Sequence, residues 1–152
     1  MKPSEIRAKL IRFCAQRERS EKEVKEKLRE LSAPESWAEE LQSEGWWNQE
    51  RYARAYAFDH WNLNHWGKEK INQGLRAAGV SSDARNKAME SIPKEEYIQK
   101  LNRLFQRKLD LATAPITEEQ LHKIRMHFLR KGYGWEDIQL AENDGGVNPK
   151  SL

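Results

Sequence analysis

One set of spacings recurs three times along the chain and limits the folds open to it. Counted from the first residue of each set, the other three lie 4, 13 and 17 positions further on. The sets are Val24, Leu28, Trp37, Leu41; Ile71, Leu75, Ala84, Ala88; and Ile124, Phe128, Asp137, Ala141, where Ile138 supplies the apolar residue one place late. Such a fixed period is typical of stacked helical units that cannot bury their apolar faces alone. Coincidence among apolar helical residues is the alternative.

Residues that start or stop helices are frequent along the chain. The signals of strands, which are a sustained alternation of apolar and polar residues and two-residue hairpin turns, are missing. Ser20 with Glu23 and Thr117 with Gln120 each form a capping box, in which a side chain and a backbone N–H bond reciprocally. We expect helices over about 4–16, 21–31, 36–44, 68–78, 82–92, 94–109 and 118–131. A further helix is expected to begin after Asn48 and to carry Tyr52 and Tyr56, and a short last helix is expected to contain Trp135 and Ile138. Glycine tolerates the left-handed backbone that ends a helix, and the structural stops expected on this basis are Gly45, Gly79 and Gly132.

These signals predict an all-α fold of about nine helices, arranged as three tandem three-helix repeat units in an elongated, curved array. We expect the repeats to span residues 1–47, 48–93 and 94–143, followed by a disordered tail over 144–152. The mean hydropathy of −0.99 and the 34% of charged residues fit a protein with much surface per residue.

Composition excludes several classes of protein. The single cysteine, Cys14, lies in an apolar helical pattern and is expected to be a small buried side chain, not a reactive thiol. No apolar stretch approaches the ~20 residues that span a bilayer, and the N-terminus lacks the pattern of a secretion signal. We therefore expect a cytoplasmic protein without a membrane partner. The net charge of +3 is too small to indicate nucleic-acid binding by itself.

A search for catalytic chemistry finds no site. The histidine pairs His60/His65 and His122/His127 are spaced five residues apart, so neither pair shares a helix face as a zinc-binding pair would. No glycine-rich phosphate loop or nucleophile elbow is present. We expect no catalytic residue, no metal site and no cofactor, and therefore a protein that is not an enzyme.

The ordered motifs resemble those of the RecX family. Residues 17–24, Arg-Glu-Arg-Ser-Glu-Lys-Glu-Val, with Lys27-Leu28, resemble the signature of the first RecX repeat. Residues 45–53, Gly-Trp-Trp-Asn-Gln-Glu-Arg-Tyr-Ala, resemble the central motif, although Trp47 stands for a leucine and Asn48-Gln49 for an acidic pair. Residues 66–71 with Leu75 and Gly79-Val80, and residues 128–133, resemble the later repeats. The connection from Leu31 to Pro34 lacks the glycine usual in the family.

The resemblance implies a regulator of the RecA recombinase that acts in homologous recombination, DNA repair and the SOS response. Such a protein lies in the groove of the RecA–DNA filament and hinders filament growth, ATP hydrolysis and strand exchange. The implied partners are the RecA filament and, weakly, single- or double-stranded DNA, and the free protein is expected to be a monomer.

Clusters of basic residues on helix surfaces are the candidate contacts with RecA or DNA. Lys70 and Lys123 each precede the repeat isoleucine, so stacked units would align basic residues into a stripe that suits a polyanion. Trp66 is a candidate for an aromatic that stacks on a partner, with a core position as the alternative, while Trp37, Trp61 and Trp135 are expected in the core. The full set is Arg17, Arg19, Lys22, Lys25, Trp66, Lys68, Lys70, Arg76, Arg103, Arg107, Lys108, Lys123, Arg125, Arg130 and Lys131. Any one of these bases can equally be an ordinary solvated side chain.

Two other functions remain open. A stand-alone helical module that binds single-stranded nucleic acid would use the same basic groups, but its affinity would fall steeply with salt and need no partner protein. A helical scaffold for unrelated proteins would bind neither DNA nor RecA.

Overall fold

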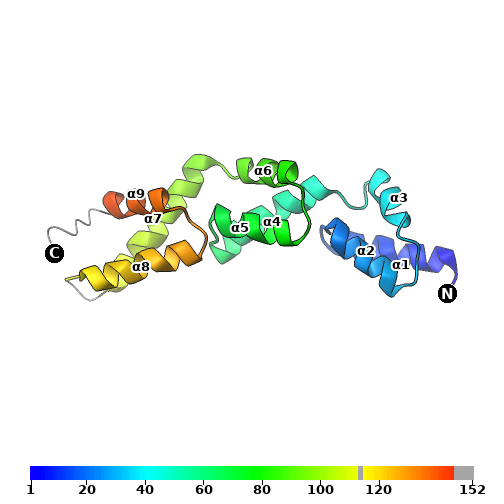
Figure 1. Cartoon of the computed structure of the whole chain (residues 1–152), viewed down its shortest axis with the longest axis horizontal. Coiled ribbons are helices and arrows are strands. Elements are labelled where there is room, and N and C mark those ends of the chain that lie inside the picture. The colour runs from blue at the N-terminus through cyan, green and yellow to red at the C-terminus, as the bar shows by residue number, and fades with distance from the viewer. Residues whose placement is uncertain (113–114, 146–152) are drawn as a thin grey trace. The chain divides into compact units, whose positions relative to one another are not determined.

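The computed structural model describes residues 1–112 and 115–145, and this part of the chain is all-α, as predicted (Figure 1). Its helices are α1 (Pro3–Gln16), α2 (Glu21–Glu30), α3 (Trp37–Ser43), α4 (Gln49–Asn64), α5 (Lys68–Ala77), α6 (Ser82–Glu90), α7 (Lys94–Leu111), α8 (Glu118–Arg130) and α9 (Trp135–Asp144). The expected tail over 144–152 lies outside the described residues from 146 onward. Asp144 is instead the last residue of α9, and Gly145 follows it as the C-cap.

The local signals explain where these helices begin. The Ser20 hydroxyl accepts a hydrogen bond from the Glu23 N–H (3.1 Å), and the Glu23 carboxylate accepts one from the Ser20 N–H (3.2 Å). Thr117 and Gln120 repeat this arrangement at the start of α8. At α6 the N-cap is Ser81, whose hydroxyl accepts from the Ala84 N–H at 3.3 Å.

The second helix of each expected repeat ends in the same way. The N–H five residues after Leu28, Leu75 and Phe128 bonds back to the carbonyl of that residue, at 2.8, 3.0 and 3.1 Å. One residue earlier the backbone is left-handed, with φ of +81° at Gly79 and +100° at Gly132. Ser32, with φ of +56°, occupies the corresponding place behind α2, so this end closes without the glycine usual there. Gly45, behind α3, has φ of +85°.

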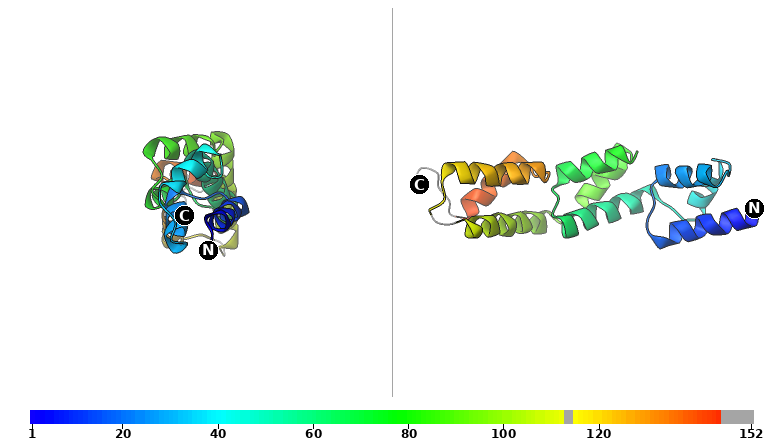
Figure 2. Two further views of the ribbon diagram at one scale, coloured as in Figure 1. Left: turned by 90° about the vertical axis from the view of Figure 1, so that its right-hand side faces the viewer. Right: turned by 90° about the horizontal axis from the view of Figure 1, so that it is seen from below.

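The chain forms two units, of which the first comprises residues 1–58 and 72–89. Its α1–α3 part encloses a core of Leu10, Cys14, Val24, Leu28, Ala38, Leu41 and Trp47. Trp47 is buried and its indole N–H donates to the Ala38 carbonyl (2.8 Å), whereas Trp46 is exposed. Figures 1 and 2 show α1 and α2 packed side by side in this part. The buried residues Ala53, Ala57, Leu75, Ala84 and Ala88 extend the interior of the unit.

The second unit comprises residues 59–71 and 90–152 and centres on α7, α8 and α9. Its interior contains a cluster of rings: Phe105 stacks on Phe128 (5.5 Å between centroids), and Tyr133 lies against both Phe128 (6.0 Å) and Tyr97 (5.5 Å). Trp61 is buried as predicted and Trp37 is half-buried against the α1–α3 core. The prediction for Trp135 is wrong, because this residue is the first of α9 and precedes the buried face that begins at Ile138; 44% of it is exposed.

The chain crosses between the two units inside α4, inside α5 and before the last residue of α6, not at the expected repeat boundaries after residues 47 and 93. Three helices nevertheless occupy each expected range. The division into three repeats remains our proposal for how the chain is built.

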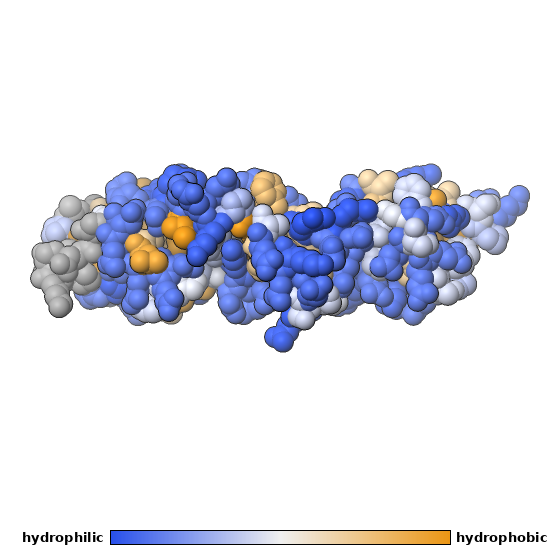
Figure 3. All heavy atoms as spheres, turned by 90° about the horizontal axis from the view of Figure 1, so that it is seen from above, coloured by the Kyte–Doolittle hydropathy of each residue, from blue (hydrophilic) through white to orange (hydrophobic). Residues whose placement is uncertain are grey.

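Hydrophilic residues cover most of the face shown in Figure 3, and apolar residues form small separate groups on it. This distribution agrees with the low mean hydropathy of the chain.

Candidate functional site

Two of the arginines proposed as partner contacts already form hydrogen bonds with groups of the same chain. Arg19 is 8% exposed; its Nε donates to the Phe13 carbonyl (2.9 Å) and its guanidinium lies 3.7 Å from the centre of the Phe13 ring. Arg125 makes a double hydrogen bond to the buried Glu142 (2.9 and 2.6 Å) and a further one to Glu118 (2.9 Å). Hydrogen bonding to Glu142 raises the pKa of Arg125. Both arginines therefore stabilise the fold, and a partner would have to displace these bonds to reach them.

The basic group on α2 and in the segment before it is balanced by carboxylates. Lys25 pairs with Glu21 at 2.9 Å, and Arg17 pairs with Glu23. A shallow pocket of about 330 Å³ brings Lys22 and Lys25 together, and it is lined by Glu21, Lys22, Lys25, Arg29, Ala78 and Gly79. Because an acidic side chain lines this pocket and pairs with one of its lysines, its attraction for an anion is reduced.

Trp66 is half-buried and already stacked. The Trp66 ring stacks on the His60 ring, with 4.1 Å between the centroids. The Lys70 Nζ packs on the Trp66 ring at 4.5 Å from its centre. Lys68 is similarly placed over Tyr97 at 4.8 Å. Of the two interpretations of Trp66, this arrangement favours a packing role, and a base or a partner side chain could stack on it only after displacing a neighbour.

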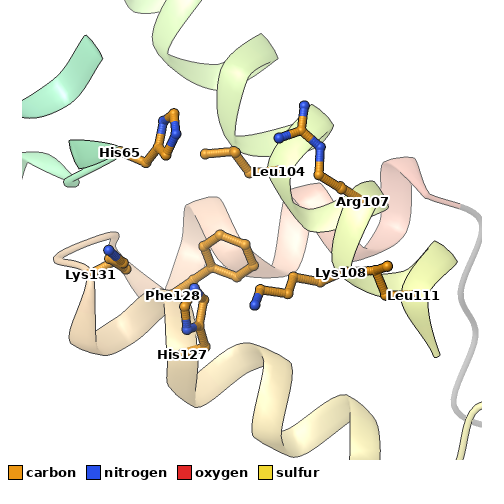
Figure 4. Close-up of a pocket in the computed structure, with 8 residues that line it drawn as sticks. All are labelled: His65, Leu104, Arg107, Lys108, Leu111, His127, Phe128 and Lys131. Carbon is orange, nitrogen blue, oxygen red and sulfur yellow. The ribbon is translucent and has the colours of Figure 1, made fainter. Parts of the chain in front are cut away.

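A group of positively charged side chains gathers at a pocket between α7 and α8 (Figure 4). A pocket of about 270 Å³ brings together three of the predicted contacts, Arg107, Lys108 and Lys131. Its remaining lining is His65, His127, Leu104, Leu111 and Phe128, with no carboxylate among them. Figure 4 shows the Phe128 ring in the middle of this group, with Lys108 extending from α7 toward it.

The helix ends hold this pocket in place. His65 follows α4 with a left-handed backbone (φ +61°), and its carbonyl accepts a hydrogen bond from the Tyr133 hydroxyl at 2.9 Å. Phe128 is buried against Phe105, so the floor of the pocket belongs to the core. Lys131 follows the last residue of α8 and its Nζ lies 3.4 Å from the Asn64 carbonyl.

Burial and the neighbouring positive charges lower the pKa values of the two histidines in the pocket. Burial lowers the pKa of His65, and the charges of Lys100, Lys131 and Arg107 lower it further. Burial likewise lowers the pKa of His127, with added effects of Lys108, Lys131 and Arg130. Both shifts disfavour the charged imidazolium, so the positive charge of the pocket comes mainly from its arginine and lysines.

Sequence reasoning did not find the two histidines, because they come from different helix ends and no sequence spacing relates them. Each belongs to a pair that was considered only as a metal site. Within residues 1–112 and 115–145, no three histidine, cysteine or acidic side chains are placed to share a metal ion. The described helices also include none with the length and apolarity of a membrane span.

The other predicted contacts are dispersed. Arg103 on α7 and Lys123 and Arg130 on α8 are exposed and do not line the pocket, and Arg76 is exposed on α5. They stay candidates on the grounds of the sequence alone.

Comparison with known proteins gives consistent results. Residues 48–89 match the family model described as RecX, second three-helix domain. "Regulatory protein RecX" of Oceanobacillus iheyensis is 28% identical over 127 residues, which is 81% of this chain and 47% of that protein. The Bacillus velezensis protein of the same name is 26% identical over 152 residues, 93% of this chain and 58% of its relative. The chain thus spans about half the length of these relatives.

Two solved structures share the fold. The crystal structure of RecX from Lactobacillus salivarius matches with a TM-score of 0.83 at 20% identity, over 95% of this chain and 97% of that one. A second crystal structure of a regulatory protein RecX matches with a TM-score of 0.78 at 17% identity, over 92% and 71% of the two chains. The predicted resemblance to the RecX family is thus confirmed: the family model matches residues 48–89, the relatives extend the similarity over most of the chain, and the fold agrees.

Proposed function

We propose that this protein binds the RecA–DNA filament in the bacterial cytoplasm and inhibits filament extension, ATP hydrolysis and strand exchange, without catalysing a reaction itself. The observation that carries the proposal is the pocket between α7 and α8, which Arg107, Lys108 and Lys131 line without a carboxylate among the lining residues. In a member of the RecX family, such a surface suits the phosphates or acidic side chains that a nucleoprotein filament presents.

The test is RecA ATP hydrolysis on single-stranded DNA, with this protein added at amounts far below one per RecA subunit and with DNA in excess. We expect hydrolysis to fall at such ratios, because a protein that blocks filament growth acts on many subunits at once. Unchanged hydrolysis even at equal amounts of the two proteins would contradict the proposal.

The same pocket also favours the alternative of a stand-alone module for single-stranded nucleic acid. Such a module would bind an oligonucleotide without RecA, and would slow RecA only when it covers most of the DNA. Titration of the DNA at a fixed amount of this protein separates the two: adding DNA relieves simple competition, whereas it leaves inhibition of the filament largely intact.

A further inference from the structure

The pocket between α7 and α8 has cationic groups that the fold itself does not use. The side chains of Arg107 and Lys108 make no ion pair or hydrogen bond with any described residue. Lys131 reaches one backbone carbonyl at the long distance of 3.4 Å. Arg125, on the same helix as His127, shows the contrast, because two carboxylates hold it. Like charges gathered in a hollow repel one another, and a bound anion would relieve that repulsion.

The size of the hollow limits the anion. Sites for complete small-molecule ligands usually measure about 300–1,000 Å³, and this pocket of about 270 Å³ lies just below that range. It suits one compact anionic group with a short apolar neighbour. Leu104 and the edge of Phe128 provide apolar surface beside the cations, and the exposed Leu111 stands at the rim.

The arrangement of donors favours a tetrahedral anion over a planar one. A carboxylate is matched best by the two parallel N–H groups of one arginine, as Glu142 is by Arg125. Here the donors come from α7, from the end of α8 and from the segment after α4, and they surround the hollow. Lysines bind phosphate as point charges, and a phosphate offers several oxygens to donors that converge from different sides.

We propose that this pocket binds a phosphate group, held by its three cations and by N–H donors of its two histidines. The inference deepens the proposed function, since it names the chemical group that one surface of the protein recognises. The phosphate can belong to a nucleic-acid backbone or to a free phosphorylated ligand, and the chemistry in the pocket is the same.

Binding should be coupled to protonation of His65 and His127. The groups that face His65 are Lys100, Lys131 and Arg107, and those that face His127 are Lys108, Lys131 and Arg130. All of them are cations, and together with burial they lower the pKa of each histidine in the free protein. A bound phosphate offsets these charges and raises both pKa values, so the complex takes up protons that the free protein does not hold. Affinity must therefore increase as the pH falls from about 8 to about 5, the range in which histidine changes charge.

The experiment uses the whole chain without RecA. Binding of a labelled oligothymidylate is measured by fluorescence anisotropy, with thymidine monophosphate, inorganic phosphate and an oligoglutamate peptide as competitors. The test variant is Lys108→Gln with Lys131→Gln, and the matched control is Arg103→Gln with Lys123→Gln. The control removes the same charge from α7 and α8 but leaves the pocket lining intact. Circular dichroism checks that both variants keep the helical fold.

We expect the test variant to lose about tenfold or more in affinity, because two of the three cations that line the pocket are removed. The control should lose about twofold. An equal loss in both variants would overturn the proposal and leave a diffuse positive surface. Stronger competition by the peptide than by phosphate or nucleotide would overturn it as well, in favour of an acidic protein segment. A nucleic-acid source predicts that the oligomer binds far better than free phosphate, while a free ligand predicts that the mononucleotide equals it.

The histidines give a second measurement. A phosphodiester keeps a constant charge over this pH range, so any pH dependence of oligothymidylate binding comes from the protein. We expect His65→Asn with His127→Gln to flatten that dependence; asparagine also tolerates the left-handed backbone of position 65. Imidazole NMR signals whose pKa values do not rise on binding would refute the coupling. If the Lys108/Lys131 variant keeps its phosphate affinity yet the unaltered chain inhibits RecA, the pocket proposal fails and the proposed function stands.

Discussion

At the scale of single residues, Gly79 and Gly132 are constrained to glycine by different features of the structure. Gly79 has φ of +81° and open space where a Cβ would lie. Gly132 has φ of +100°, and a Cβ there would lie 2.5 Å from both the backbone nitrogen and the Cβ of Lys70. Gly67 lies equally close, since its own Cβ would meet the Gly132 carbonyl at 2.4 Å. The sequence signal for a helix stop is the same at both positions, but only the structure reveals the close approach.

We therefore predict that Gly132→Ala destabilises the protein more than Gly79→Ala. The alanine at position 79 has to adopt a left-handed backbone only, at a cost of about 1–2 kcal/mol. At position 132 the overlap with α5 adds about 1–3 kcal/mol. Urea denaturation followed by circular dichroism measures both free energies of unfolding. Equal losses would show that the close approach of residue 132 to Lys70 relaxes without cost.

At the scale of helices, the sequence predicted starts and ends well because these depend on neighbours in the chain. The capping boxes at Ser20 and Thr117 were readable from four consecutive residues each, and both are present. The burial of Trp135 was predicted wrongly, since its position at the start of α9 decides its exposure. The pocket between α7 and α8 was unpredictable, because its lining comes from three separate segments, and His65 and His127 are 62 positions apart in the sequence.

The pair formed by Arg125 and Glu142 joins α8 to α9, and we predict an asymmetric response to its loss. Arg125→Leu leaves the Glu142 carboxylate, 7% exposed, without a countercharge and should cost about 3 kcal/mol or more. Glu142→Leu should cost less, because Arg125 keeps Glu118 as a partner. The double variant should be more stable than Arg125→Leu alone, since no buried charge remains. Thermal and urea unfolding of the three variants test this order, with Glu118→Gln as a control that changes stability little.

At the scale of the whole molecule, residues of the second expected repeat depend on the third. The Lys100 ammonium donates to the Trp61 and Asn62 carbonyls, and burial lowers its pKa. The Tyr97 hydroxyl accepts a hydrogen bond from the Lys68 N–H at 2.9 Å. These bonds explain why residues 59–71 belong to the unit of α7–α9 although they continue α4 and begin α5. Repeats defined by sequence and units defined by packing therefore have different boundaries.

A fragment of residues 1–93 should consequently be incompletely folded. We predict that residues 59–71 lose their protection against hydrogen exchange, because their partners on α7–α9 are missing, while residues 1–58 and 72–89 keep most of theirs. Exchange measured by mass spectrometry on the fragment and on the whole chain makes the comparison. Full protection of 59–71 in the fragment would mean that each repeat folds as an independent domain.

The backbone contact between α8 and α5 has a consequence for the sequence at the joint between them. The Gly67 N–H donates to the Lys131 carbonyl (2.8 Å) and the Glu69 N–H to the Gly132 carbonyl (3.0 Å), so the end of one helix supplies the acceptors that the start of another lacks. These two hydrogen bonds join main-chain atoms, so they depend on the backbone geometry and not on the identity of the side chains. At this joint the sequence is therefore constrained most at Gly67 and Gly132, where a side chain would separate the two backbones.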